Sequence, residues 1–177
     1  MKIEPMDLLT ILVIDDEEDV RVFLKKALER RGYSVITAAD GDEGLEKIKQ
    51  FEIPIVFCDI LMPKLNGIDF LREVHNYNLA TQVIMVTGST NLNTCIEAVE
   101  NGACGYLIKP VNIDDLAELI LMAKRNIAEK KGMLRRVIEK LSPDEVDNVL
   151  RRILLKKDIR DKKDIIKETL DKKREDK

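Results

Sequence analysis

The chain has 177 residues, of which 45% are hydrophobic and 36% are charged, so we expect one packed domain with a highly charged surface. The formal net charge of −3 gives no overall signal for binding nucleic acid. No apolar run approaches the roughly 18 residues that a membrane helix needs, and the first residues lack the apolar stretch of a secretion signal. Since the three cysteines are also odd in number, we predict a cytoplasmic protein with reduced thiols and no membrane contact.

Five short apolar runs have the composition of strands buried on both faces, as in a parallel sheet. They are Leu8–Ile14, Tyr33–Ala38, Ile55–Cys58, Gln82–Val86 and Gly105–Ile108. Apolar residues at helical spacing between them predict helices over Val20–Arg31, Gly41–Gln50, Ile68–His75 and Leu92–Asn101, and a fifth from near Asn112. We expect Asp16 or Asp19 to cap the first helix. Strands that alternate with helices in this way predict an α/β fold with a doubly wound five-stranded parallel sheet.

Several of the predicted strands end on a side chain that is capable of chemistry. Right-handed crossovers place the carboxyl ends of parallel strands along one edge of the sheet, where open α/β folds bind their ligands. Asp15, Asp16, Asp59, Thr87 and Lys109 are therefore expected to converge from four strands. Taken alone, Asp59 also fits a residue that caps a loop or helix, and Lys109 also fits a structural ion pair with Asp59.

Three carboxylates at a poorly solvated site can all stay ionised only if a cation offsets their charge. Oxygen ligands without a nearby histidine or cysteine favour a hard cation, Mg²⁺ above all. Lys109 and Thr87 would supply the point charge and the hydrogen-bond donor that a phosphoryl group needs. A carboxylate between the metal and the lysine can attack phosphorus and form an acyl phosphate. The residues therefore predict a magnesium-dependent site that accepts a phosphoryl group.

Four motifs, in order and at strand ends, carry a resemblance to a known family. They are the acidic pair Asp15-Asp16, the sequence D-I-L-M-P-K-L-N-G at Asp59–Gly67, T-G at Thr87-Gly88 and A-V-E-N-G-A-C-G-Y-L-I-K-P at Ala98–Pro110. Residues 8 to about 125 resemble the receiver domain of two-component response regulators, the CheY-like domain. The resemblance implies the flavodoxin-like strand order 2-1-3-4-5 and a receiver domain over residues 1–130.

The resemblance also implies which residues accept the phosphoryl group and hold the metal. Asp59 would be the phosphoacceptor. Asp16 and Asp59 would bind Mg²⁺ directly, Asp15 would act largely through water, and the carbonyl of Leu61 would be a further ligand. No position that the family uses for this chemistry is missing from the chain.

The remaining positions concern the phosphoryl oxygens and the switch. By the same resemblance, Thr87 and Lys109 would bind the phosphoryl oxygens and Tyr106 would be the aromatic switch, for which plain packing is the alternative. The Lys109-Pro110 bond would be cis. Gly105 departs from the Asp or Asn that is commoner before the switch aromatic, which loosens that loop slightly without touching the chemistry.

The helix that begins near Asn112 carries apolar residues in a heptad pattern as far as Leu141, with Lys130 as the break. This pattern predicts a parallel homodimer through residues 112–141. The alternative is a helix whose first half packs on its own sheet and whose second half packs on the C-terminal tail. Gly132 weakens the helix locally and marks a possible hinge.

A helical, charged extension is expected over residues 131–177. Residues 133–177 carry a net charge of +4, against −7 for the residues before them. The basic residues of the extension are interleaved with acids, so nucleic acid is an unlikely partner. Ser142, Pro143 and Glu145 form a capping box that predicts a further helix.

We therefore predict a two-component response regulator whose Asp59 accepts a phosphoryl group from a sensor histidine kinase and which catalyses its own phosphorylation and dephosphorylation. Phosphorylation is expected to change the face made by the fourth helix, fifth strand and fifth helix, and through it dimerisation or the docking of a protein output partner. Two alternatives are a transcription regulator, whose C-terminal part binds DNA or leads to a further output domain, and a constitutive scaffold.

Overall fold

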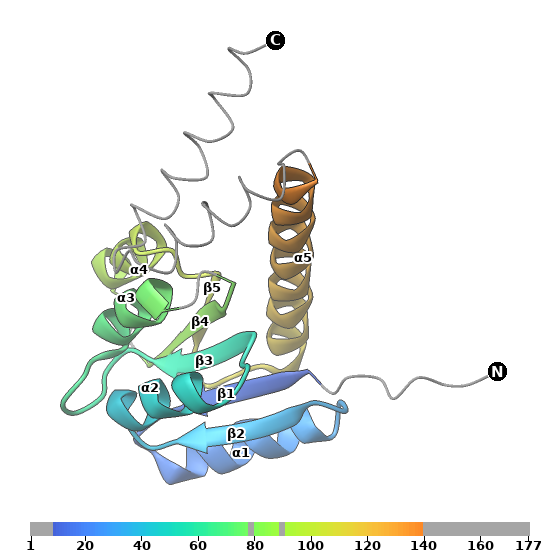
Figure 1. The fold of residues 1–177 in the computed structure, drawn as a ribbon. Helices are drawn as coiled ribbons and strands as arrows, with labels where there is room; N and C mark the ends of the chain where they lie inside the picture. Colours follow the sequence, from blue (N-terminus) through green and yellow to red (C-terminus); the bar gives the residue numbers. More distant parts are fainter. Residues whose placement is uncertain (1–8, 78–79, 89–90, 140–177) are drawn as a thin grey trace.

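The computed structural model describes residues 9–77, 80–88 and 91–139 of the chain (Figure 1). These residues form the strands β1 (Thr10–Ile14), β2 (Ser34–Ala38), β3 (Ile55–Asp59), β4 (Gln82–Thr87) and β5 (Gly105–Ile108). They also form the helices α1 (Glu18–Glu29), α2 (Gly41–Gln50), α3 (Gly67–Tyr77), α4 (Leu92–Glu100) and α5 (Ile113–Ile138). All strand pairs are parallel, in the order β2-β1-β3-β4-β5. The predicted flavodoxin-like α/β fold and its strand order are confirmed.

Helices cover both faces of the sheet, and this explains why the central strands are continuous apolar runs. One core cluster joins the sheet to α1 and α5, and it includes Leu24, Leu28, Leu116, Ile120 and Ala123. The second joins the opposite face to α2, α3 and α4, and it includes Ile48, Phe70, Leu71, Val74 and Ala98. All of β3 and β4 is buried, because alternate side chains of these strands enter the two clusters.

The strand register decides which residues lie side by side at the carboxyl edge of the sheet. Ile14 of β1 pairs with Cys58 of β3, so the residues that follow them, Asp15 and Asp59, lie at the same level of the sheet. On the other side of β3, Thr87 of β4 pairs with Ile108 of β5. The backbone N–H of Lys109 then donates to the Thr87 carbonyl at 2.7 Å, which continues the pairing by one residue. The parallel register therefore delivers acidic, hydroxyl and ammonium groups to one edge.

The start of α1 differs from the prediction. The residue before the helix is Glu17, which makes no side-chain cap, so neither Asp16 nor Asp19 caps α1. Asp19 lies inside the first turn, and Asp16 comes one residue too early. The backbone N–H of Glu17 instead donates to Oδ1 of Asp15 at 2.9 Å. At the fifth helix, by contrast, the side chain of Asn112 accepts from the N–H of Asp114 at 3.0 Å, as an N-cap does.

The heptad pattern of α5 is in large part a core-facing stripe. Leu116, Ile120 and Ala123 are buried against the sheet of their own domain, and Ile127 is half-buried beside them. These positions are not available to a second helix. The first half of the stripe therefore follows the alternative of packing on the chain's own sheet, and the dimer expected through residues 112–141 stays a prediction. A stripe at heptad spacing suits either arrangement, because both need apolar residues three and four positions apart.

The capping box at Ser142 and the rest of the predicted extension from residue 140 lie outside the described residues. Within the part of the chain that is described, no helix combines the length and the apolar composition that a membrane crossing requires.

Gly67 is the point at which the loop after β3 returns to the sheet. Its backbone N–H donates to the Ile60 carbonyl at 3.0 Å. A Cβ atom at this position would lie 2.8 Å from the Cα of Ile60 and would collide with the carbonyl oxygen of Asp59. The backbone at Gly67 therefore packs directly against the backbone of Asp59 and Ile60, and only glycine fits at position 67.

We predict that Gly67→Ala lowers the free energy of unfolding by about 1–3 kcal/mol, because backbone atoms must move to admit the methyl group. Gly132→Ala is the matched control. It adds the same methyl group where no atom lies within 4 Å, and alanine in a helix is favoured over glycine by up to about 1 kcal/mol. Urea denaturation of both variants measures the effect. Equal stability of Gly67→Ala and the wild-type protein would contradict the close packing.

Candidate functional site

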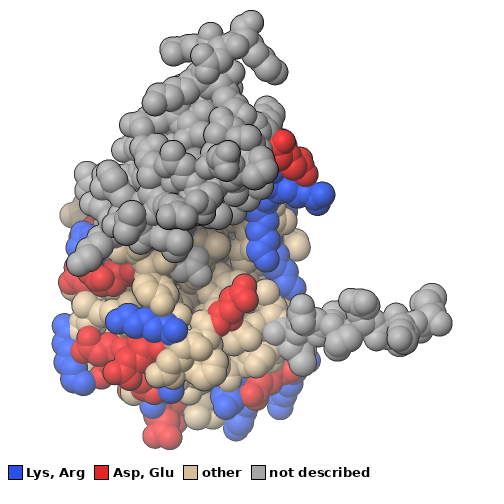
Figure 2. All heavy atoms as spheres, viewed as in Figure 1, with Lys and Arg blue, Asp and Glu red and all other residues tan. Residues whose placement is uncertain are grey.

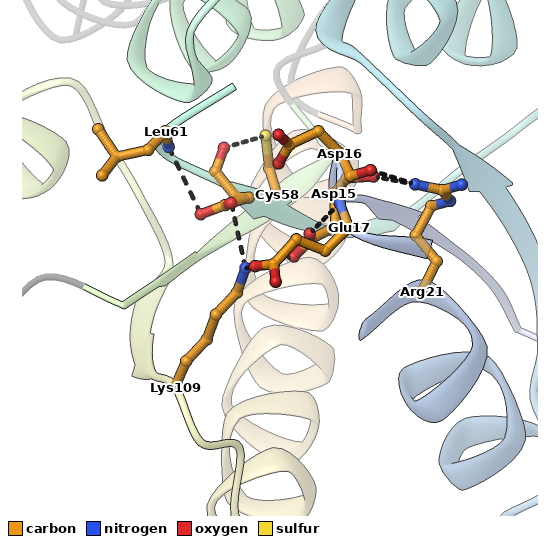
Figure 3. A network of polar contacts seen from close by, with 8 residues as sticks. Asp15, Asp16, Glu17, Arg21, Cys58, Leu61 and Lys109 are labelled. Carbon is orange, nitrogen blue, oxygen red and sulfur yellow. Dashed lines mark hydrogen bonds and ion pairs between the residues drawn. The ribbon is translucent and has the colours of Figure 1, made fainter. Parts of the chain in front are cut away.

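The site lies at the carboxyl edge of the sheet, where three strands contribute charged groups (Figure 3). Asp59 is the last residue of β3 and Asp15 follows β1; they are only 4% and 1% exposed. Lys109 follows β5, and its side chain extends along this edge to Asp15 and Asp59. The structure thus brings together three of the residues that the sequence predicted to converge.

The Lys109 ammonium is the centre of the cluster. Its Nζ lies 2.8 Å from Oδ2 of Asp15, 3.0 Å from Oε1 of Glu17 and 3.1 Å from Oδ2 of Asp59. The contacts with Glu17 and Asp59 are hydrogen bonds, whereas the contact with Asp15 is an ion pair without hydrogen-bond geometry. One ammonium therefore faces three carboxylates, which leaves an excess of negative charge in a partly buried site.

This arrangement shifts the pKa values of the charged groups. Burial raises the pKa of Asp59 above its ordinary value, and the nearby Lys109 ammonium opposes that rise. For Lys109, burial alone would lower the pKa, but the contacts with Asp15, Glu17 and Asp59 outweigh burial and raise it. The ammonium is thus held charged, while the charge on Asp59 is disfavoured in the absence of a further cation.

The three acids have the geometry of a metal-binding group. Asp15, Glu17 and Asp59 each offer a carboxylate oxygen, and these oxygens all lie within 4.8 Å of one another. Within the described residues, Oδ2 of Asp15 is the buried side-chain oxygen that accepts no hydrogen bond. A buried carboxylate oxygen in that condition is a ready ligand for a hard cation.

Asp16 does not join this group. Its side chain is exposed, and its carbonyl accepts a hydrogen bond from Nη1 of Arg21 at 3.0 Å. Glu17 takes the third place, although the sequence analysis did not assign it a role. Side chains two apart on an extended segment point the same way, so Glu17 follows Asp15 and Asp16 points elsewhere. The position of Glu17 two residues after Asp15, on a segment that stays extended up to α1, was the signal that could have identified it.

Leu61 lies directly beside Asp59. Its backbone N–H donates to Oδ1 of Asp59 at 3.4 Å, and its side chain is 66% exposed. The other side of Asp59 is the core, where the Cys58 thiol donates to the Asp59 carbonyl at 3.2 Å. The Asp59 carboxylate is therefore held by the backbone N–H of Leu61, in the segment that follows β3, and by the Lys109 ammonium.

Thr87 and Tyr106 occupy neighbouring strands next to the charged cluster. Thr87 is fully buried, and Tyr106 pairs with Met85 across β4 and β5. Burial and, to a smaller extent, a hydrogen bond with Cys95 of α4 raise the pKa of Tyr106 to about 12, while a hydrogen bond with Thr87 acts in the opposite direction. The Tyr106 hydroxyl thus connects β4 to α4. The Lys109-Pro110 peptide bond, which completes this edge, is cis.

Solved structures of receiver domains have the same fold. The response regulator receiver domain protein from Clostridium thermocellum is 38% identical, with a TM-score of 0.64, over 71% of this chain and 99% of that one. The CheY-like receiver domain protein from Methanospirillum hungatei JF-1 is 34% identical, with a TM-score of 0.64, over 71% of this chain and 98% of that one. These structures are covered almost completely, which places the likeness in a whole domain.

Curated relatives are longer proteins. The transcriptional regulatory protein ZraR of Klebsiella oxytoca is 37% identical over 106 residues, which are 60% of this chain and 24% of that protein. The alkaline phosphatase synthesis transcriptional regulatory protein PhoP of Bacillus subtilis (strain 168) is 37% identical over 100 residues, or 56% of this chain and 42% of that protein. The chain thus spans about a quarter to two fifths of these relatives.

The match to a family covers more than half of the chain. The family model for the response regulator receiver domain matches residues 11–121, which run from β1 into α5 and include Asp15, Glu17, Asp59 and Lys109. Together with the parallel sheet order and the acidic cluster at its carboxyl edge, this match establishes that the chain belongs to the response regulator receiver domain family.

Proposed function

We propose that this protein is a switch of two-component signalling in which Asp59 accepts a phosphoryl group from the phosphohistidine of a sensor histidine kinase. The contact between the Lys109 ammonium and Oδ2 of Asp59, at 3.1 Å within the acidic cluster, carries this proposal. It places a fixed positive charge beside the attacking carboxylate, where charge develops on the phosphoryl oxygens during transfer.

In the transfer, a carboxylate oxygen of Asp59 forms a bond to phosphorus while the bond from phosphorus to the histidine nitrogen breaks. The imidazole nitrogen leaves with the electron pair and takes up a proton. Hydrolysis later reverses the state, because water attacks phosphorus and the carboxylate of Asp59 leaves. Lys109 and Thr87 are proposed to hold the phosphoryl oxygens in both steps, the first as a point charge and the second as a hydroxyl donor.

Magnesium fits this donor set. The excess of carboxylates over ammonium groups favours a hard cation, and the buried Oδ2 of Asp15, which contacts only the Lys109 ammonium among the described residues, is a suitable ligand. Asp15 and Asp59 would hold it, with the carbonyl of Leu61 and either Asp16, as the resemblance implies, or Glu17, as the cluster suggests. When bound, Mg²⁺ supplies the positive charge that offsets the acids and the phosphoryl oxygens.

The phosphorylated state is proposed to be transmitted through Thr87 and Tyr106 to α4. A phosphoryl group that draws the Thr87 hydroxyl toward Asp59 removes it from Tyr106, whose hydroxyl also contacts Cys95 of α4. The aromatic ring is then free to take another position, which biases an existing equilibrium between two states of this face.

The face that reports this change carries exposed apolar side chains. Leu92, Ile96 and Val99 lie on one side of α4 because they are four and three residues apart, and they are 70%, 46% and 65% exposed. Ile108 of β5 is exposed as well. We propose that this α4–β5–α5 face docks a protein output partner, with residues 1–130 as the receiver domain and residues 131–177 as the charged extension that completes the output.

A second candidate function is transcription regulation, which the names of the curated relatives favour. On the molecular face seen in Figure 2, acidic and basic side chains lie interspersed. Such a mixture is poorly suited to the phosphate backbone, so DNA binding would have to come from outside the receiver domain. A salt-dependent mobility shift with duplex DNA would support this function, and its absence leaves the protein-docking output in place.

Phosphorylation of Asp59 has a direct test. With a small-molecule phosphoryl donor and Mg²⁺, we expect the intact mass of the wild-type protein to increase by one phosphoryl group. Asp59→Asn is expected to remain unlabelled because it lacks the attacking carboxylate, and EDTA is expected to prevent labelling of the wild type. Asp42→Asn, which removes an exposed acid of α2, is the matched control and should label normally. An unchanged wild-type mass would overturn the proposed switch.

The raised pKa of Asp59 predicts a pH-dependent difference in stability. In the folded state this carboxyl binds its proton more tightly than in the unfolded state, so its contribution to stability falls as the pH rises from the ordinary value of 3.8 through the raised pKa. In EDTA, Asp59→Asn should therefore be more stable than the wild type at pH 7, and the difference should shrink as the pH falls.

Urea denaturation at several pH values measures this difference. Asp16→Asn removes an exposed carboxylate between β1 and α1 and should match the wild type throughout. A loss of stability in Asp59→Asn at pH 7 would mean that the Lys109 contact outweighs the burial of the charge.

The output proposal predicts a change in assembly that depends on the extension. With beryllofluoride and Mg²⁺ as a phosphoryl mimic, light scattering should show a larger assembled mass for the full chain, alone or with its partner. A truncation near Gly132 should fold, because the buried part of α5 ends before it, and should lose this response. The same response in the truncated chain would place the output wholly within the receiver domain.

A further inference from the structure

Three carboxylates surround the ammonium group of Lys109. An ammonium has three N–H donors and no acceptor. Within the described part of the chain, Nζ faces Asp15, Glu17 and Asp59 at 2.8, 3.0 and 3.1 Å. Two of the contacts, with Glu17 and Asp59, are hydrogen bonds, and the third is the ion pair with Asp15. A phosphoryl oxygen on Asp59 therefore competes with these carboxylates for the ammonium.

The three carboxylates differ in how easily they can leave. The side chains of Asp15 and Asp59 are 1% and 6% exposed, whereas that of Glu17 is 64% exposed. A buried carboxylate that loses its cation keeps an uncompensated charge in a medium of low dielectric constant. An exposed carboxylate returns to water at little cost, since exposed ion pairs contribute little to stability. Glu17 is therefore the partner that leaves.

Charge repulsion acts in the same direction. Glu17 offers a carboxylate oxygen within 4.8 Å of an oxygen of Asp59. A phosphoryl group on Asp59 adds negative charge next to Glu17, so the two compete for the same ammonium and repel each other. The backbone of Glu17 need not move, because its N–H stays bonded to Oδ1 of Asp15 at 2.9 Å.

We propose that Glu17 is the exchangeable partner of Lys109: it holds the ammonium beside Asp59 in the unphosphorylated protein and yields that place to a phosphoryl oxygen. Glu17 is thus a positioning residue, which acts on the reaction through Lys109. This role rests on the proposed phosphorylation of Asp59. It makes the occupancy of Lys109 by Glu17 a barrier that every phosphoryl group or anionic mimic has to overcome.

The test compares Glu17→Gln with Glu18→Gln at saturating Mg²⁺. Both variants remove one negative charge from an exposed glutamate, but Glu18 lies in the first turn of α1 and outside the cluster. For Glu17→Gln we expect the rate of labelling by an anionic phosphoryl donor and the affinity for beryllofluoride each to rise about two- to fivefold, the range of an exposed ion pair. Glu18→Gln should match the wild type in both.

Two further measurements separate the possible outcomes. The Mg²⁺ affinity of each variant, from calorimetry without a phosphoryl donor, identifies a metal ligand: a large loss of Mg²⁺ affinity together with slower labelling in Glu17→Gln would overturn the exchange. Equal behaviour of the two variants would overturn it as well. If the wild type itself is not labelled while beryllofluoride affinity still rises in Glu17→Gln, the phosphorylation proposal fails and the exchange at Lys109 stands.

Discussion

The Lys109 ammonium is the interaction on which the functional edge depends. Without it, three carboxylates would face one another beside a buried core and would lose the ammonium that they share. The ammonium reaches them because β5 continues one position past the level of Asp59: Asp59 pairs with Val86, Thr87 pairs with Ile108, and Lys109 follows directly. The apolar core sets the register of the strands, and this register places Lys109 next to the three carboxylates.

The core and the site are linked through the backbone around Asp59. Gly67 lies so close to the backbone of Asp59 and Ile60 that a methyl group has no room, and this contact holds the backbone that carries the Asp59 carboxylate. At Gly88, on the side of Thr87, an added Cβ would meet no atom within 4 Å. The backbone is therefore closely packed at Gly67 and has open space at Gly88.

The proposed input and output of the domain depend on different properties of exposed side chains: the charge of Glu17 and the apolar face of α4. At the proposed input, the decisive quantity would be the free-energy cost of returning a charged partner of Lys109 to water, and the exposure of Glu17 makes it the partner with the lowest cost. At the output, Leu92, Ile96 and Val99 keep apolar surface in contact with water, which becomes useful only when a partner covers it. The Tyr106 hydroxyl, in contact with both Thr87 and Cys95, lies between these two regions.

The sequence by itself determined the sheet, its alternating helices and the convergence of Asp15, Asp59 and Lys109, because apolar runs and strand ends are local features that the parallel fold lines up. Helix ends were less certain, since several acids in a row can each precede α1. Only the tertiary structure decided that Glu17 and not Asp16 faces Lys109, because the turn of the backbone before α1 selects which side chain points inward. It also decided that the first half of the heptad stripe of α5 packs on its own sheet: a periodic pattern records which face is apolar, and only the folded chain shows what covers that face.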